Sequence, residues 1–399
     1  MRKLKHPWIV AVVGASSVMC ITFVVLLVTG TIQVGSGASD SAEPPAPVDT
    51  AHAAARASID TEEIRAGLEA IGLSDVPENV LATLSTLEKI DDFPIYTMRY
   101  FGPYVRASEL RSEDDGQAAN SEAPIDWACS LFAALGDPSW PVLGRNFDWE
   151  YSPILVLLLE PEEGYRSIMS IDIAYLVEPG DVDRLDECDV DKLLPLLSAP
   201  FLTFDGMNEH GLAIGMASVD YVCGYPSDPD KRDVGDLVMM REVLEAAATV
   251  DEAIAFLEGI NPVSQGGPNT HYLIADDTPS AALIEYHEGE MYVFRSSAEA
   301  PWQCGTNFPV VLTDGNPTGR CWRYDLIEQT LRENGGDLSS LDSMELLEDV
   351  STPSTQWSIT YDLSKRIMYL AVGGDIDTVY GISLETGEAT PQSDSGSAH

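Results

Sequence analysis

The sequence predicts an α+β fold, arranged as a layered αββα sandwich. From Cys129 onward, runs of apolar and β-branched residues bounded by turn signals predict strands at 129–135, 141–149, 153–160 and 167–177. The helical patterns come in blocks between runs of strands, and do not alternate with single strands as in parallel α/β folds. A chain of 399 residues, of which 45% are hydrophobic, is long enough to bury the core that such layers require.

The spacing of apolar residues, together with turn signals, predicts the other helices and strands. Apolar residues at helical spacing predict two helices, near 64–71 and 80–87, separated by Pro77. A helical pattern in two pieces covers 236–259, and its second piece opens with a capping box from Thr249 to Glu252. The remaining predicted elements are an extended stretch at 93–105, a strand, turn and strand at 201–219 with the turn at 208–211, strands at 271–276 and 281–294, helices near 322–331 and 343–348, and a last hairpin at 356–372.

The N-terminus predicts export. Basic residues precede an apolar stretch without charge, residues 8–30, which is longer than the ~7–15 residues of a signal peptide and close to the ~20 that span a bilayer. This favours a signal anchor over a cleaved signal peptide in residues 1–34, although small residues offer a cleavage site after Ala38. A linker rich in Ala, Ser, Pro and Gly follows at 35–58. The rest of the chain is expected outside the membrane, either anchored or secreted.

Charge and cysteine content exclude some classes of partner. Lys and Arg total 22 against 65 Asp and Glu, and the net charge of −43 repels nucleic acids, so we expect no nucleic-acid partner. In an exported protein the cysteines beyond Cys20 are expected to pair, and the local pairing of 188 with 223 and 304 with 321 is one of three connectivities. The Cys and His residues show no close ligand spacing, so neither a metal nor a cofactor is expected.

One predicted hairpin carries reactive residue types. Cys129 opens the strand at 129–135, and Arg145 and Asp148 follow sixteen and nineteen residues later, on the predicted partner strand. Paired strands lie only ~4.8 Å apart, so both side chains can come near the sulfur. A nucleophilic Cys requires nearby positive charge and a base. The same pattern also fits a buried structural thiol, a disulfide partner, or a plain cross-strand ion pair between Arg145 and Asp148.

The motifs that follow, taken in order, resemble one family. The stretches "GRNFDW", "DGMNEHGLAIGM", "NTHYLIADDTPSAALIEY", "GTNFPV", "RCWRYDLIEQTL" and "QWSITYDLSKRIMYL" lie between about residues 95 and 372. With Cys129 they resemble the choloylglycine hydrolase and linear amide C–N hydrolase family, which includes bile salt hydrolases, penicillin V acylases, N-acylethanolamine acid amidases and acid ceramidases. The resemblance implies the four-layer αββα sandwich of the N-terminal nucleophile hydrolases.

The resemblance also implies site residues. It makes Cys129 the nucleophile, Arg145 and Asp148 its electrostatic and orienting partners, Asn307 an oxyanion donor and Arg323 a late active-site arginine.

The chain departs from the family pattern at one position. Ser218 stands where bile salt hydrolases have a second asparagine, which puts one oxyanion donor and bile salt chemistry in doubt. Arg320 is close enough to Arg323 to exchange with it by a slip of three residues. Outside the resemblance, Asn307 also reads as a turn residue and Arg323 as a helix-surface charge. A papain-like pairing of Cys129 with His210, His271 or His287 is a further alternative.

The family mechanism implies maturation. The base in these enzymes is the α-amine of the nucleophile itself, which titrates near ~7.7–8.0, so the Cys must become N-terminal. Residues 59–128 would then be a helical pro-segment ending in the polar loop at 111–124, removed by autocleavage before Cys129, and 129–399 would be the catalytic domain. The resemblance allows the pro-segment to stay bound.

These expectations define the function classes. The leading one is an exported amidase that hydrolyses small N-acyl amides through an acyl-thioester on Cys129, with neutral or lipid-like substrates favoured over bile salts by the net charge. The alternatives are an acyltransferase of the penicillin-forming type and a catalytically decayed, membrane-tethered binding protein.

Overall fold

The computed structural model describes residues 60–91, 93–111, 128–220, 224–265 and 268–392. These belong to one compact unit, Asp49–His399. The predicted signal segment 1–34 and the linker 35–58 lie outside the described residues, as does most of the loop at 111–124. Among the helices that are described, none is long and apolar enough to cross a membrane.

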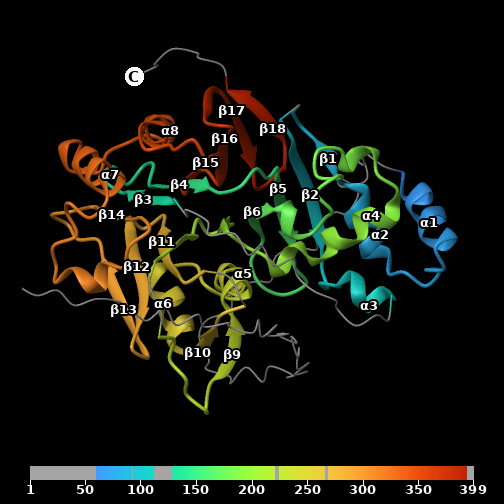
Figure 1. Ribbon diagram of the computed structural model, residues 1–399, viewed down its shortest axis with the longest axis horizontal. Coiled ribbons are helices and arrows are strands. Elements are labelled where there is room, and N and C mark those ends of the chain that lie inside the picture. The colour runs from blue at the N-terminus through green and yellow to red at the C-terminus, as the bar shows by residue number, and fades with distance from the viewer. Residues whose placement is uncertain (1–59, 92, 112–127, 221–223, 266–267, 393–399) are drawn as a thin grey trace, which may run out of the picture. The chain divides into compact units, whose positions relative to one another are not determined.

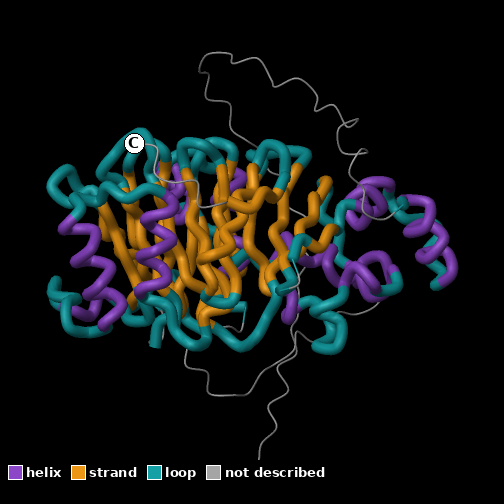
Figure 2. Tube along the Cα trace, turned by 90° about the horizontal axis from the view of Figure 1, so that it is seen from above, coloured by secondary structure: helices purple, strands orange, loops and turns teal. Residues whose placement is uncertain are grey.

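Two sheets form the centre of the described unit. One has seven strands, in the spatial order β14 (Trp302–Gly305), β3 (Ser130–Ala134), β4 (Val142–Asp148), β15 (Thr355–Asp362), β16 (Ile367–Val372), β17 (Asp375–Ser383) and β18 (Ala389–Gln392). The other has nine, in the order β1 (Glu88–Lys89), β2 (Ile95–Phe101), β5 (Ile154–Glu160), β6 (Ser167–Asp172), β7 (Asp205–Asn208), β8 (Ala213–Ser218), β11 (Thr270–Asp276), β12 (Ser280–His287) and β13 (Glu290–Arg295). Figure 2 shows their strands side by side, with loops gathered at the two ends.

Helices cover the outer faces of both sheets. Figure 1 shows α7 (Trp322–Glu333) and α8 (Ser340–Asp349) over the seven-stranded sheet, and α5 (Asp236–Ala246) and α6 (Val250–Glu258) over the nine-stranded sheet. The α+β prediction is therefore confirmed, and these helices and sheets follow the order α, β, β, α. Because strands such as β5 are covered on both faces, they read as continuous apolar runs.

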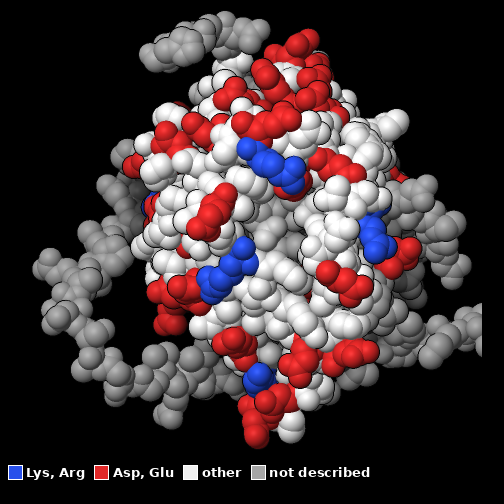
Figure 3. Space-filling model, turned by 90° about the vertical axis from the view of Figure 1, so that its left-hand side faces the viewer, with Lys and Arg blue, Asp and Glu red and all other residues white. Residues whose placement is uncertain are grey.

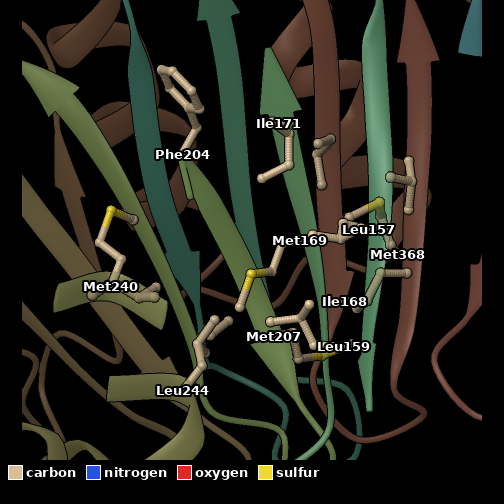
Figure 4. Packing of buried hydrophobic residues seen from close by; sticks show 14 of the residues in the cluster. Leu157, Leu159, Ile168, Met169, Ile171, Phe204, Met207, Met240, Leu244 and Met368 are labelled. Atoms are coloured by element: carbon tan, nitrogen blue, oxygen red, sulfur yellow. The ribbon is translucent and has the colours of Figure 1, made fainter. Parts of the chain in front are cut away.

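The sheets approach closely beneath the start of β3. A Cβ on Gly215 of β8 would lie 3.1 Å from Leu131 of β3, so glycine is what allows the two sheets to meet there. On the outer face, Gly206 of β7 similarly admits α5, and Figure 4 shows Leu244 of that helix beside Met169. This close contact fixes the neighbouring residues of β3 and β8 relative to one another.

Segment 59–128 is more than helical. Its helices α1 (Thr61–Ala70) and α2 (Glu78–Ser85) confirm the predicted pair, and α3 (Ala107–Arg111) follows. Between them, β2 pairs with β5 in parallel along seven residues, from Ile95 opposite Ile154 to Phe101 opposite Glu160. The segment therefore supplies strands to the same sheet as the predicted catalytic domain.

Most other predicted elements are present, and the differences have local causes. The predicted strand 167–177 ends at Asp172, because that side chain accepts a hydrogen bond from the Ala174 amide and starts a 3-10 turn, η2 (Ile173–Tyr175). The capping box of α6 is only half formed: Thr249 accepts from the Glu252 amide, but Glu252 accepts from Ala248.

Several short elements were not predicted from the sequence. They are η3 (Leu185–Glu187), α4 (Val190–Leu193), η4 (Leu194–Phe201), η5 (Val310–Thr313), and the parallel pair β9 (Arg232–Gly235) and β10 (Ile260–Val263), besides β1, α3, β14, β17 and β18.

The expected disulfides are not formed among the described residues. Cys188, Cys304 and Cys321 are free thiols, so the pairing of 304 with 321 is wrong, while Cys223 lies outside the described residues. Cys304 is buried in β14 beside the Tyr324 hydroxyl, and burial raises the pKa of its thiol to about 12, which keeps it protonated and unreactive.

Candidate functional site

The predicted hairpin is present and positions Cys129. Strand β3 pairs antiparallel with β4, with Leu131 opposite Arg145, and Cys129 immediately precedes β3. Antiparallel pairing brings the start of β3, the ends of its neighbours β4 and β14, and the start of β15 beyond β4 to the same end of the sheet. Cys129 is buried and free, so the disulfide alternative is wrong.

Several groups act on the Cys129 sulfur. Burial raises the pKa of the thiol, the positive charge of Arg145 opposes that rise, and the Asp148 carboxylate adds to it. Hydrogen bonds from the backbone amides of Asp148 and Ser218 favour the thiolate. The raised pKa means that the sulfur rests as a thiol, whose reaction as a nucleophile requires a base.

Arg145 is held by a carboxylate from the other sheet. Its guanidinium forms a buried ion pair with Asp205 of β7, and the Tyr361 hydroxyl donates to the other oxygen of that carboxylate. The guanidinium carbon also lies 4.9 Å from the centre of the Phe147 ring. The alternative of a cross-strand ion pair between Arg145 and Asp148 is therefore wrong: both residues lie on β4, and Arg145 pairs across the sheet interface.

Asp148 ends β4 with one oxygen bonded and one not. Thr355 donates a hydrogen bond of 2.5 Å to Oδ1, whereas Oδ2 is buried without a hydrogen-bond partner among the described residues and lies 3.8 Å from Nη1 of Arg323. Burial raises the pKa of Asp148 to about 6, despite the opposing effects of Thr355, Arg323 and Arg145. The site therefore contains a carboxylate that an additional cation would stabilise.

Arg323 connects the helical layer to Cys129. It lies in the first turn of α7, is only 6% exposed, and donates to the Cys129 carbonyl, to Ser130 Oγ at 3.0 Å and to Asn307 Oδ1 at 2.8 Å. The helix-surface alternative is therefore wrong. Arg320 is exposed outside the helix, so the structure places Arg323 and not Arg320 in the cluster.

Asn307 and Ser218 are joined by hydrogen bonds. Asn307 follows β14, and its Nδ2 donates to both the carbonyl oxygen and the hydroxyl of Ser218, each at 2.9 Å. Asn307 is thus more than a turn residue, because its amide joins two segments. Ser218 contributes its backbone N–H to the sulfur and its hydroxyl to Asn307, so the position that departs from the family pattern still lies in the site.

The structure adds residues that the sequence did not single out. Asp205 and Tyr361 hold Arg145, and Thr355 holds Asp148. An acidic residue directly after the apolar stretch FLTF was a usable signal for Asp205. Thr355 and Tyr361 gave no such signal, because Thr and Tyr are common residues in strands.

The three histidines have partners other than Cys129 among the described contacts. His271 pairs with Glu285 at 2.9 Å, and the ring of His210 packs 4.2 Å from that of Tyr165. His287 packs near Tyr292 at the end of β12. No group of three or more His, Cys, Asp or Glu in the described part of the chain is arranged to hold a metal ion.

Comparisons with known proteins add the family. The model for linear amide C–N hydrolases of the choloylglycine hydrolase family matches residues 129–303, and no curated protein matches the chain. Among solved structures, similarity is found to a variant of the conjugated bile acid hydrolase from Clostridium perfringens (18% identity, 66% of this chain and 96% of that one, TM-score 0.47) and to penicillin V acylase from Agrobacterium tumefaciens (18%, 66% and 90%, 0.44). A Caenorhabditis elegans ortholog of the N-acylethanolamine-hydrolyzing acid amidase is 14% identical, with 59% and 93% covered and a TM-score of 0.38.

The family match begins at Cys129, the residue on which the hydrogen-bonded cluster converges, and it includes the hairpin that carries Arg145 and Asp148. Over residues 129–303 the chain is similar to the linear amide C–N hydrolases of the choloylglycine hydrolase family.

Proposed function

We propose that the chain is an amidase that cleaves N-acyl amides with Cys129 as an N-terminal nucleophile. The observation that carries this proposal is that side chains far apart in the sequence, those of Arg145, Asp148, Asn307 and Arg323, converge on Cys129. A structural thiol needs neither the two backbone N–H groups at its sulfur nor a guanidinium on its own carbonyl oxygen.

The proposed reaction has two steps. The α-amine of Cys129 takes the thiol proton, and the sulfur attacks the substrate carbonyl, forming an S–C bond and a tetrahedral oxyanion. The backbone N–H of Ser218 and Nδ2 of Asn307 are the donors proposed to stabilise that oxyanion. The α-ammonium then protonates the departing amine, which leaves a thioester. In the second step water, deprotonated by the α-amine, attacks the thioester and releases the carboxylic acid and the thiol.

Asp148 supports the requirement for a free α-amine. Its Oδ2 is buried and without a hydrogen-bond partner among the described residues while Cys129 is linked to Ala128, and such an oxygen is costly. Cleavage before Cys129 would create an ammonium one residue from β3, opposite the end of β4 that carries Asp148. The new cation would lower the pKa of the carboxyl group and orient the amine next to the sulfur.

We also propose that the protein is exported and that the pro-segment stays bound after cleavage. Export rests on the apolar stretch 8–30 alone. Retention is supported by β2, which pairs with β5 along its length, and by Tyr104, whose hydroxyl donates to Glu245 of α5. These contacts do not pass through the peptide bond between Ala128 and Cys129, so its hydrolysis leaves them intact.

Neutral N-acyl amides are the proposed substrates. Both guanidinium groups near the sulfur already bind acceptors of the chain, Arg145 the Asp205 carboxylate and Arg323 the Asn307 side chain, so each has fewer N–H groups left for a substrate carboxylate. Figure 3 shows Asp and Glu side chains spread over the face nearest α7, with few Lys or Arg among them. An anionic conjugate would meet repulsion from this surface.

The raised pKa of Asp148 predicts a pH dependence of stability in the uncut chain. The folded-state value of about 6 exceeds the ordinary 3.8, so the contribution to stability is present below the ordinary value and is lost as pH rises through the folded one. Between about pH 4 and pH 7 we expect Cys129→Ala to lose roughly 3 kcal/mol of unfolding free energy relative to Cys129→Ala/Asp148→Asn. Urea denaturation measures the difference, and a difference independent of pH would contradict the assigned environment of Asp148.

Maturation is the test of the mechanism. Intact-mass measurement of the purified protein should show a fragment 129–399 with Cys129 at its N-terminus. In the proposed cut the Cys129 sulfur attacks the carbonyl of Ala128, the acyl group moves from nitrogen to sulfur, and water then releases it. Cys129→Ala should therefore remain one uncut, inactive chain. Cys129→Ser should cut slowly, because a hydroxyl can make the same acyl shift, and should hydrolyse amides poorly. A fully active enzyme in which Cys129 is still linked to Ala128 would exclude the α-amine as the base.

The oxyanion donors can be separated by substitution. Asn307→Ala removes a side-chain donor and should lower kcat by about 10²–10³-fold. Ser218→Ala keeps the backbone N–H that faces the sulfur, so its kcat should stay close to that of the wild type. Both are measured per mole of cut chain, so that a defect in maturation is not counted. Equal losses in the two variants would contradict the assignment of the backbone N–H.

A fluorogenic panel tests the substrate class. Neutral N-acyl amides should be hydrolysed faster than glycine or taurine conjugates, because the anionic conjugates meet a negative surface and partly occupied guanidinium groups. Added amine should not divert most of the thioester into a new amide. Preference for the anionic conjugates would contradict the proposed substrate class, and efficient capture by the amine would indicate an acyltransferase.

A further inference from the structure

A buried His–Glu pair lies beside the site without a part in the reaction proposed above. Nδ1 of His271, on β11, is 2.9 Å from Oε1 of Glu285, on β12, and both side chains are almost fully buried. A buried carboxylate requires hydrogen-bond partners to offset the loss of water. Its other partners show what the pair does.

Glu285 holds the segment that follows Asn307. Its Oε1 accepts from the Val310 amide at 2.8 Å, and its Oε2 accepts from the Val311 amide at 2.7 Å. These two amides begin η5, three and four residues after Asn307. Hydrogen bonds from backbone amides to a carboxylate are stronger than those between neutral groups, so this attachment is strong for so short a turn.

His271 meets the segment on the other side of Asn307. Gly305, the last residue of β14, lies against the imidazole so closely that a Cβ there would be 3.1 Å from Cε1 and 3.2 Å from Nε2 of His271. The pair therefore contacts the chain two residues before Asn307 and three residues after it. Between these contacts, the Asn307 side chain reaches Ser218 and Arg323.

We infer that Glu285, held by His271, is a positioning residue for Asn307. The inference rests on the proposed function, in which Nδ2 of Asn307 stabilises the oxyanion. Such a donor works only if it is placed to within a fraction of an ångström, and the rigid attachment to strands β11 and β12 supplies that placement. Glu285 itself touches neither the sulfur nor the Asn307 side chain in the hydrogen bonds described.

The primary test is a double-mutant cycle between Glu285→Gln and Asn307→Ala. Glutamine keeps the shape and one acceptor oxygen but turns an NH₂ group toward one of the two amides. Glu285→Gln should lower kcat by about 10- to 100-fold, the loss expected from misplacing a catalytic donor, with KM little changed. The double variant should be no slower than Asn307→Ala. If the two losses multiply instead, Glu285 does not act through Asn307 and the inference is overturned.

Asp276→Asn is the matched control. Asp276 lies on β11, is 1% exposed, and accepts from the Val250 amide at 2.7 Å where α6 begins. It is therefore a buried carboxylate that caps a different helix. Asp276→Asn should lower the stability as Glu285→Gln does but leave kcat near wild type. A loss of kcat in Asp276→Asn that also disappears in the Asn307→Ala background would show a general effect of damaging the sheet, and would overturn the inference.

Amide hydrogen exchange gives a readout that does not depend on turnover. Glu285→Gln should speed exchange in 305–313 and not at the start of α6, whereas Asp276→Asn should do the reverse. Unchanged exchange in 305–313 overturns the inference whether or not the enzyme is active. If the wild type hydrolyses no N-acyl amide, the proposed function fails, and the exchange result alone decides whether Glu285 holds the segment.

Discussion

The ion pair between Arg145 and Asp205 is the interaction on which the site depends. It joins β4 of one sheet to β7 of the other, is fully buried, and lies beside the sulfur of Cys129. A buried charge that loses its partner costs about 3–5 kcal/mol, so the two sheets cannot slide at this point without that penalty. The same contact that holds the two sheets in place therefore also brings positive charge to the Cys129 sulfur. The packing of the sheets and the charge at the sulfur depend on one guanidinium.

The sequence could predict features that depend on residues close together in the chain. The hairpin of Cys129 and Arg145 follows from apolar strands around a turn, and the family motifs selected Asn307 and Arg323 although no spacing in the chain links them. The partners of Asp205 and Thr355 were beyond such reasoning, since they lie 60 and 207 residues away and only the packed sheets bring them together. The parallel pairing of β2 with β5 was missed for the same reason, because a strand read from periodicity carries no information about its neighbour.

Ser218 shows how a site tolerates a departure from its family pattern. The sulfur receives the backbone N–H of this residue, and a backbone donor is present whatever the side chain is. The serine hydroxyl takes a different part, as an acceptor for the Asn307 amide. A substitution at this position therefore changes which acceptors the Asn307 side-chain amide finds more than it changes the environment of the thiol. The geometry of the strand end matters more here than the identity of the residue.

The place of β2 in the nine-stranded sheet bears on how the protein can be made. Without residues 59–128, β5 would become an edge strand, and its sequence ILVLLLE would present a flat, almost uncharged row of unpaired amides and carbonyls to other chains. Such an edge promotes aggregation, and the short β1 outside β2 leaves only a small edge in its place. During synthesis β2 emerges before β5 and is ready to cover it. The N-terminal segment thus covers an apolar strand that would otherwise form the edge of the sheet, and a gene that begins at Cys129 lacks that cover.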